Sequence, residues 1–178
     1  MYFSKSVSFL FAILVLSKCA SSSPSSLISA ACSNTGIDNF DVESCIDILE
    51  SDNKTSPAKN FRDLSVGIME AGIANATLTR AYLVKKSSEG GSNNSTGVFR
   101  QCKLAYDNVI VNVEIALSDL KVDPPTATYD LGLAANDSMQ PCIAAVRRGN
   151  VTDGIVLTGN KSVLIYLNSA VAAVDRIK

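Results

Sequence analysis

Residues 98–146, VFRQCKLAYDNVIVNVEIALSDLKVDPPTATYDLGLAANDSMQPCIAAV, decide the fold of this chain. Apolar residues recur in the first half at alternating intervals of three and four, which places them on one stripe of a helix. They are Phe99, Cys102, Tyr106, Val109, Val113, Ala116 and Leu120. Asp123-Pro124-Pro125 comes next, and the residue before a proline resists the helical conformation. We therefore predict a long helix that ends before this segment.

The second half of the same stretch predicts a second helix with a stripe of its own. That stripe contains Leu131, Ala135, Ser138, Cys142 and Ala145. Antiparallel helices that turn at residue 122 bring Cys102 opposite Cys142, and both lie on inward stripes, so we expect a disulfide there. In the chain-entropy model, a bridge that closes about 40 residues stabilises the fold by roughly 4 kcal/mol. Pro141 removes a backbone hydrogen bond and should kink the second helix.

The first residues have the pattern of a signal peptide. Lys5 precedes an apolar run at residues 7–16, and small residues follow around Ala20. The run is too short to span a bilayer, no later run reaches that length, and the C-terminus lacks the hydrophobic tail of a lipid-anchor signal. We predict that residues 1–21 are removed and that residues 22–178 form one secreted domain without a membrane partner.

Removal of residues 1–21 takes away two lysines and Cys19. The net charge then changes from −1 to −3, and a mildly acidic chain without tryptophan or a basic run has no electrostatic footprint for nucleic acid. The four remaining cysteines imply two bridges in an oxidising compartment, with three possible pairings. The hairpin geometry selects Cys102–Cys142, which leaves Cys32 to pair with Cys45.

Seven Asn-X-Ser/Thr sequons follow the predicted signal and indicate a glycoprotein. Asn75 lies on the apolar stripe of a predicted helix, and an asparagine that faces the core cannot carry a glycan. We expect glycans among the other six, which are Asn53, Asn93, Asn94, Asn136, Asn150 and Asn160.

The rest of the chain predicts further helices. Residues 22–29 suggest a flexible lead, and residues 30–49 a small helical hairpin with Gly36 and Asn39 at its turn and Asp41 as an N-cap. Pro57 predicts the start of a long helix, and residues 87–95 a loop. The stripe of that helix contains Phe61, Leu64, Ile68, Ala71, Leu78 and Tyr82. The last helix is expected from near Ser162 to the C-terminus.

Together these segments predict an all-α fold. It is an up-and-down antiparallel four-helix bundle with an N-terminal helical hairpin and two disulfides, because the connections are short enough for antiparallel neighbours. The sequence shows no alternating strand pattern and no internal repeat.

The residue inventory argues against catalysis. The chain has no histidine, which excludes Ser-His-Asp and Cys-His catalysis and any histidine metal site. It has no CxxC, P-loop or GxGxxG motif, and all mature cysteines are assigned to bridges. Asp107 and Glu114 lie two turns apart on an outward helix face, which is typical of surface charge rather than of a glycosidase pair. We predict a binding protein without catalytic residues, metal or cofactor.

The chain resembles the plant pectin methylesterase inhibitor and invertase inhibitor family, including its pollen-allergen-like branch. The matching features are the signal peptide, Cys32 and Cys45 in a leading hairpin, and the position of Cys142. Three segments also match: Leu64-Ser65-Val66-Gly67-Ile68, Ile73-Ala74-Asn75-Ala76-Thr77 and Cys102-Lys103-Leu104-Ala105-Tyr106-Asp107. The resemblance covers essentially all of the mature chain and implies a helical bundle that blocks the active site of an apoplastic enzyme.

The resemblance implies a 1:1 complex with a plant pectin methylesterase, or with an acid invertase. The second and third bundle helices would lie across the esterase cleft. Their outward positions, with the loop between them, are Arg100, Lys103, Asp107, Asn108, Glu114, Pro124, Pro125, Thr126, Asp130, Asn136 and Asp137. Invertase inhibitors insert a Pro-Lys-Phe segment of that loop, of which only Pro124 is matched here. This difference favours the esterase.

Two other functions stay open. Pro141 replaces the threonine that usually precedes the last bridging cysteine, and an Asn136 glycan would stand on the contact face, so the chain could be a member without inhibitory activity. Alternatively, the wide apolar faces of the first two long helices could line a cavity, as in a carrier of lipids or small molecules. A filled core would exclude that cavity.

Overall fold

The computed structural model describes residues 25–89 and 93–178. The predicted signal peptide lies outside these ranges, and the side chains of Asn93 and Asn94 are likewise outside the described ones. The described residues contain seven α-helices, one π-helical turn and no strand. They are α1 (Ser26–Ser33), α2 (Val42–Ser51), α3 (Phe61–Ser88), α4 (Asn93–Asp119), α5 (Pro124–Leu133), η1 (Ala134–Ser138), α6 (Gln140–Arg148) and α7 (Gly154–Val174).

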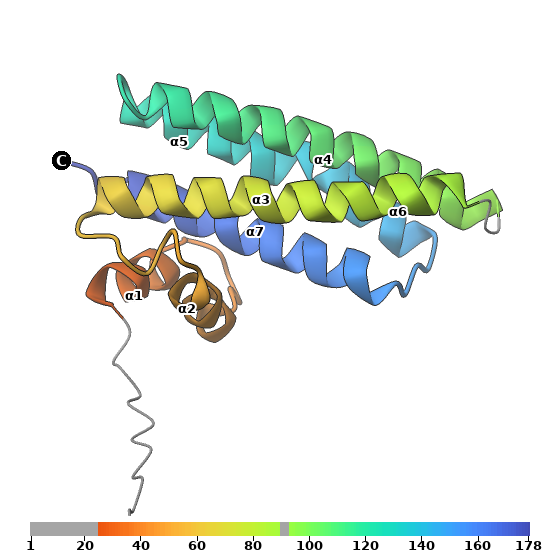
Figure 1. Ribbon diagram of the computed structural model, residues 1–178, viewed down its shortest axis with the longest axis horizontal. Helices are drawn as coiled ribbons and strands as arrows, with labels where there is room; N and C mark the ends of the chain where they lie inside the picture. The colour runs from red at the N-terminus through yellow and green to blue at the C-terminus, as the bar shows by residue number, and fades with distance from the viewer. Residues whose placement is uncertain (1–24, 90–92) are drawn as a thin grey trace, which may run out of the picture.

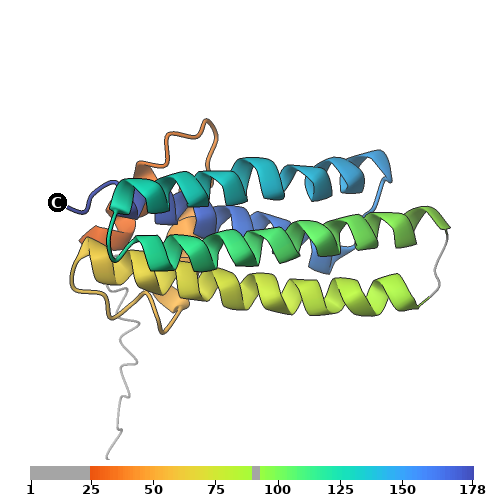
Figure 2. The same ribbon diagram turned by 90° about the horizontal axis from the view of Figure 1, so that it is seen from above.

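Four long rods form the bundle: α3, α4, the continuous run of α5, η1 and α6, and α7 (Figure 1). α3 contacts α4 and α7, while α4 contacts α5 and α6, and α5 contacts α7. The rods therefore close into a ring in which sequence neighbours are antiparallel. The α1–α2 hairpin packs at the end of the bundle that holds the C-terminus, against α7 and α3 (Figures 1 and 2). The predicted all-α fold is confirmed.

The two central stripes are also confirmed. Every residue that was placed on the inward stripes of residues 98–146 is buried. Cys102 is bonded to Cys142 with their Cα atoms 4.3 Å apart, and Cys32 is bonded to Cys45. The apolar faces of α3 and α4 belong to one contiguous core cluster, so they fill the interior rather than line a carrier cavity.

Helix starts are where the sequence prediction was wrong. α3 begins at Phe61 rather than Pro57, because Asn60 caps it by accepting a hydrogen bond from the Asp63 amide at 2.8 Å.

α7 begins at Gly154 rather than near Ser162. There, Asp153 Oδ1 accepts hydrogen bonds from the amides at 155 and 156. The predicted flexible lead, residues 22–29, overlaps the first half of α1, which starts at Ser26, and α4 starts inside the predicted 87–95 loop. The Asp41 cap of α2 is confirmed.

The predicted apolar stripe of α3 faces the core only in the first half of the helix. Leu64, Ile68 and Ala71 are buried, but Leu78 is 73% exposed, and Thr79 and Leu83 are buried instead. The prediction spaced apolar residues by 3.5 on average, whereas an α-helix turns once per 3.6 residues, so the two patterns diverge by about 20° per heptad. Asn75 is half-buried, and its Oδ1 is enclosed without a hydrogen-bond partner.

Pro141 interrupts the third rod as expected. The run of residues 124–148 divides into α5, η1 and α6, with Pro141 in the first turn of α6. Since proline has no amide proton, the backbone widens just before it, and the Met139 amide donates to the Ala134 carbonyl at 3.2 Å, five residues back. This wider turn keeps Ser138 and Cys142 both facing the core.

The statement that no later apolar run reaches membrane-spanning length was wrong for α7. This helix of 21 residues is long and apolar enough to cross a bilayer by length and composition. In the fold it contacts α1, α2, α3 and α5, and most of its residues from Val163 to Val174 are buried. The apolar character of α7 is explained by its packing between the other bundle helices and the α1–α2 hairpin.

Candidate functional site

A ridge of exposed residues runs along the outer side of α4. We call these seven residues the α4 ridge: Gln101, Leu104, Asn108, Val111, Ile115, Ser118 and Val122, the last in the turn after the helix. They recur every three or four residues, and each is exposed. Four are large and apolar: Leu104, Val111, Ile115 and Val122 have exposed fractions of 56%, 51%, 44% and 88%. Such a row of apolar side chains in water is unusual and indicates a contact surface.

The ridge is open in the fold. Figure 2 shows α4 between α3 on one side and the α5–α6 rod on the other, with no described element in front of it. The helix beneath the ridge is held by its buried stripe and by the Cys102–Cys142 bridge. The ridge is therefore a rigid surface, which reduces the entropy lost when a partner binds.

The structure turns Lys103 and Asp107 away from the ridge, toward α3. Asp107 pairs with Arg80 of α3 and, at 2.6 Å, with Lys103 one turn earlier. Burial by itself would raise the pKa of Asp107, but hydrogen bonds from Lys103 and Arg80 outweigh it and hold the pKa below its usual value. Asp107 therefore forms an ion pair between α3 and α4, with Lys103 paired to it on α4, and both predicted contact residues remain partly exposed.

Arg100, Asn108 and Glu114 are exposed, as the sequence suggested. Asn108 lies on the ridge itself. Glu114 lies at the edge that faces α3, where it lines a groove of about 340 Å³ together with Arg62 and Lys121. These polar residues give the apolar ridge a charged rim on its α3 side, as protein interfaces commonly have.

The turn between α4 and α5 is short. Pro124 and Pro125 occupy the first positions of α5, and Thr126 donates a hydrogen bond from its hydroxyl to Asp123 Oδ2 at 2.7 Å. Pro124 is half-buried, whereas Pro125 and Thr126 are exposed. One turn further, Tyr129 is 66% exposed, and it adds an aromatic ring to the outer side of α5.

Asp130 and Asp137 differ in their surroundings. Asp137 is exposed, and so is Asn136 beside it. Asp130 is half-buried, and its Oδ2 is enclosed without a hydrogen-bond partner. Burial, together with the neighbouring carboxyl of Asp119 on α4, raises the pKa of Asp130. Asp130 therefore lies at the contact between α4 and α5 rather than on the exposed outer side of α5.

Sequence reasoning missed the apolar members of the ridge and Tyr129. Apolar residues were assigned to the core, and charged ones to the contact face, because exposed apolar side chains cannot be told from buried ones by type alone. A signal was present, since Leu104, Val111 and Ile115 repeat at helical spacing on a second stripe, outside the cysteine-bearing one.

The structure places the sequons in different environments. Asn53, Asn136 and Asn150 are exposed and suit a glycan. Asn160 is in an environment that does not favour the expected glycan. Its side chain is only 7% exposed, and its Oδ1 accepts a hydrogen bond from the buried Tyr106 hydroxyl at 2.9 Å. Within residues 25–89 and 93–178, no group of three or more acidic or cysteine side chains is placed to hold a metal ion.

Comparisons with known proteins point to one fold. No family model and no curated protein matches the chain. A solved mutant form of a pectin methylesterase inhibitor from Arabidopsis superposes with a TM-score of 0.75 at 23% identity, over 86% of this chain and 99% of that one. A pectin methylesterase inhibitor from Arabidopsis thaliana gives 0.64 at 22% identity, over 86% and 97%. The chain therefore has the fold of these inhibitors.

Proposed function

We propose that this protein is a secreted member of the pectin methylesterase inhibitor and invertase inhibitor family, and that it blocks the active-site cleft of a plant pectin methylesterase in a 1:1 complex. The observation that carries the proposal is the α4 ridge, a rigid apolar surface on a fold shared with such inhibitors. No catalytic group takes part in this mechanism; inhibition is steric exclusion of the substrate.

The ridge has the composition of a binding hot spot. Leu104, Val111 and Ile115 would be desolvated at the centre of the contact, while Arg100 and Glu114 would remain at the rim. Central apolar anchors supply most of the binding energy, and rim charges mainly set the association rate. A standard interface buries about 800 Å² on each partner, which one face of two adjacent helices can provide.

The α4–α5 connection favours the esterase over an invertase. Insertion into an active site requires a protruding loop, but here only residues 120–123 separate the two helices. Pro124 and Pro125 are already part of α5, and neither a lysine nor a phenylalanine follows them before Tyr129. The outer side of α4 and α5 therefore offers a partner more surface than the short turn between them.

The two disulfides support secretion as part of the proposal. Both bridges lie in the core and join residues 13 and 40 positions apart. Such bonds persist in oxidising compartments, such as the secretory pathway and the extracellular space. Removal of residues 1–21 and release into the apoplast are the corresponding expectations from the sequence.

The test is an inhibition titration of the protein against a plant pectin methylesterase and a cell-wall acid invertase at mildly acidic pH. We expect the esterase alone to be inhibited. Val111→Asp and Ile115→Asp should each weaken inhibition by about tenfold or more, because each places a charge in the desolvated centre of the contact.

Leu78→Asp is the matched control. Leu78 is also an exposed apolar residue on a long helix, but it lies two positions from Arg80, which faces α4, and so points to the other side of α3. Equal losses for Leu78→Asp and Val111→Asp would refute the ridge as the contact surface. Inhibition of invertase alone would refute the esterase as target and move attention to Pro124, Pro125 and Thr126.

The variant Asn136→Gln, which cannot carry a glycan, distinguishes an inhibitor whose contact face is covered by a glycan from a protein without inhibitory activity. Asn136 is exposed on the third rod, and a glycan there would stand near the contact face. If the glycosylated protein is inactive but the Asn136→Gln variant inhibits the esterase, the proposed surface stands. If both fail against both enzymes, the chain is a non-inhibitory member of the fold.

A further inference from the structure

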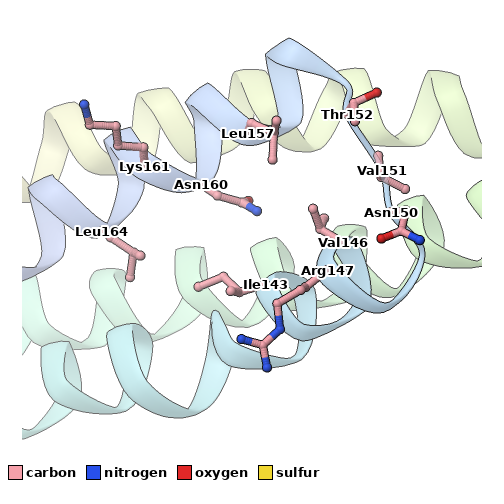
Figure 3. A pocket seen from close by; sticks show the side chains of 10 residues that line it. All are labelled: Ile143, Val146, Arg147, Asn150, Val151, Thr152, Leu157, Asn160, Lys161 and Leu164. Atoms are coloured by element: carbon pink, nitrogen blue, oxygen red, sulfur yellow. The ribbon is translucent and has the colours of Figure 1, made fainter.

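A groove between α6 and α7 lies apart from the α4 ridge. It has a volume of about 510 Å³, within the range that small-molecule sites occupy. Ile143 and Val146 of α6 form one wall, and Leu157 and Leu164 of α7 form the other (Figure 3). The segment that joins the two helices closes one end with Val151. The walls are thus almost entirely apolar.

Three uncharged polar side chains, Asn150, Thr152 and Asn160, also line the groove, and of these only Asn160 is buried. This side chain is more than nine-tenths buried, and the Tyr106 hydroxyl donates to its Oδ1 at 2.9 Å. That bond turns the amide nitrogen, Nδ2, outward, and Figure 3 shows it pointing into the space between the helices. Nδ2 has no acceptor among the residues that the structure describes. Nδ2 is not among the enclosed polar atoms of the described residues, so it is accessible from the groove, where a ligand oxygen would act as its acceptor.

Two cationic side chains, Lys161 and Arg147, lie at the rim of the groove, and Lys161 already has an ion-pair partner. Lys161 points away from the groove, where its Nζ pairs with Asp41 at 2.8 Å and also donates to Ser44 (Figure 3). Arg147 is exposed beside Ile143, and no carboxylate within the described part of the chain pairs with it. A free guanidinium beside an apolar trough favours a carboxylate with an apolar tail.

We propose that this groove binds a small amphipathic monocarboxylate of the fatty-acid class. The acyl chain would lie between Leu157 and Leu164 of α7 and Ile143 and Val146 of α6. The carboxylate would accept a hydrogen bond from Asn160 Nδ2, and the exposed Arg147 side chain, whose guanidinium points away from α7 in Figure 3, would swing toward the carboxylate to add a charge-assisted bond. The site is independent of the proposed inhibition, because none of its residues lies on the α4 ridge.

The test uses octanoate as the probe and 1-octanol as its uncharged analogue, with protein made without glycosylation. Calorimetry gives the affinity, and NMR follows the side-chain amide of Asn160. Octanoate should shift that resonance in a saturable way. Arg147→Gln should weaken octanoate binding by about tenfold or more and leave 1-octanol unaffected, since only the carboxylate uses the guanidinium.

Leu157→Asn and Ile155→Asn form a matched pair in the first turns of α7. Both residues are exposed, but only Leu157 lines the groove. Leu157→Asn should weaken both ligands, and Ile155→Asn neither. An Asn160 amide that does not shift, or an unchanged octanoate affinity in Arg147→Gln, would overturn the proposal. So would a glycan on Asn160 in protein secreted by plant cells, because that glycan would occupy the groove.

Discussion

At the scale of single residues, the buried and half-buried polar groups show how the environment decides a side chain's role. Tyr106 is fully buried, which raises the pKa of its phenol, and its hydroxyl donates a hydrogen bond to Asn160. Asp107 and Asp130 lie on neighbouring rods, yet their pKa values move in opposite directions. Asp107 faces two cations, whereas Asp130 faces the carboxyl of Asp119.

Asp130→Asn should stabilise the protein at pH 7. Because the pKa of Asp130 is raised in the folded state, the fold holds this proton more tightly than the unfolded chain, and wild-type stability falls as the pH rises through the folded pKa. The variant removes the repulsion from Asp119, and the gain in unfolding free energy should be below about 1 kcal/mol at this partly exposed site.

Urea unfolding at pH 7 and at pH 3 checks this expectation. The advantage of Asp130→Asn should disappear below pH 3.8, the pKa of aspartate in an unfolded chain, where the carboxyl is protonated in both states. Asp137→Asn, on an exposed residue of the same rod, is the control and should change little. An advantage that is independent of pH would contradict the role assigned to the proton.

At the scale of elements, close backbone approach explains two glycines in the middle of α3. A Cβ at Gly67 would collide with the carbonyl of Lys54, in the turn that leads into the helix. That turn is held by the buried Thr55, whose hydroxyl donates to the Leu49 carbonyl. A Cβ at Gly72 would come within 3.1 Å of Tyr166 Cβ on α7. The helical penalty of both glycines is thus offset by packing.

Gly67→Ala should destabilise the protein by about 1–3 kcal/mol, because the new methyl group meets backbone that cannot rotate away. Gly97→Ala is the matched control on α4. A Cβ there meets nothing within 4 Å, so the substitution should stabilise by up to about 1 kcal/mol through helix propensity. Thermal melts of both variants compare the two effects, and a stabilised Gly67→Ala would show that the turn at Lys54 is free to move.

At the scale of the whole molecule, two covalent bridges hold different parts of the fold. Cys32–Cys45 closes the α1–α2 hairpin, which packs on one end of the bundle. Cys102–Cys142 joins α4 to α6, and so ties the ridge helix to the rod on the far side of the α4–α5 turn. The second bridge therefore supports the surface that we assign to the partner enzyme.

Loss of the central bridge should cost more than loss of the hairpin bridge. In the chain-entropy model, closing 40 residues is worth roughly 4 kcal/mol and closing 13 roughly 3 kcal/mol. Paired alanine substitutions at each bridge, compared by chemical denaturation, test the order. Equal or reversed losses would mean that the packing of the α1–α2 hairpin depends on its bridge more than chain entropy predicts.

The sequence by itself determined the all-α class, the antiparallel central hairpin, both disulfides and the kink at Pro141. These features depend on local rules: helical periodicity, proline chemistry and the symmetry of residues about a turn. The Asp41 cap and the turn at Gly36 and Asn39 were found for the same reason, and both turn residues have positive φ angles of 68° and 58°.

Only the tertiary structure decided which exposed residues act together. Leu104, Val111 and Ile115 form an outer ridge rather than a second core stripe because α3 and the α5–α6 rod pack on either side of α4 and leave that face open. Asp107 pairs with α3 because Arg80, 27 residues earlier, lies opposite it. Asn160 faces a groove because Tyr106 holds its oxygen. Each outcome depends on contacts between rods, which the order of residues along one helix does not encode.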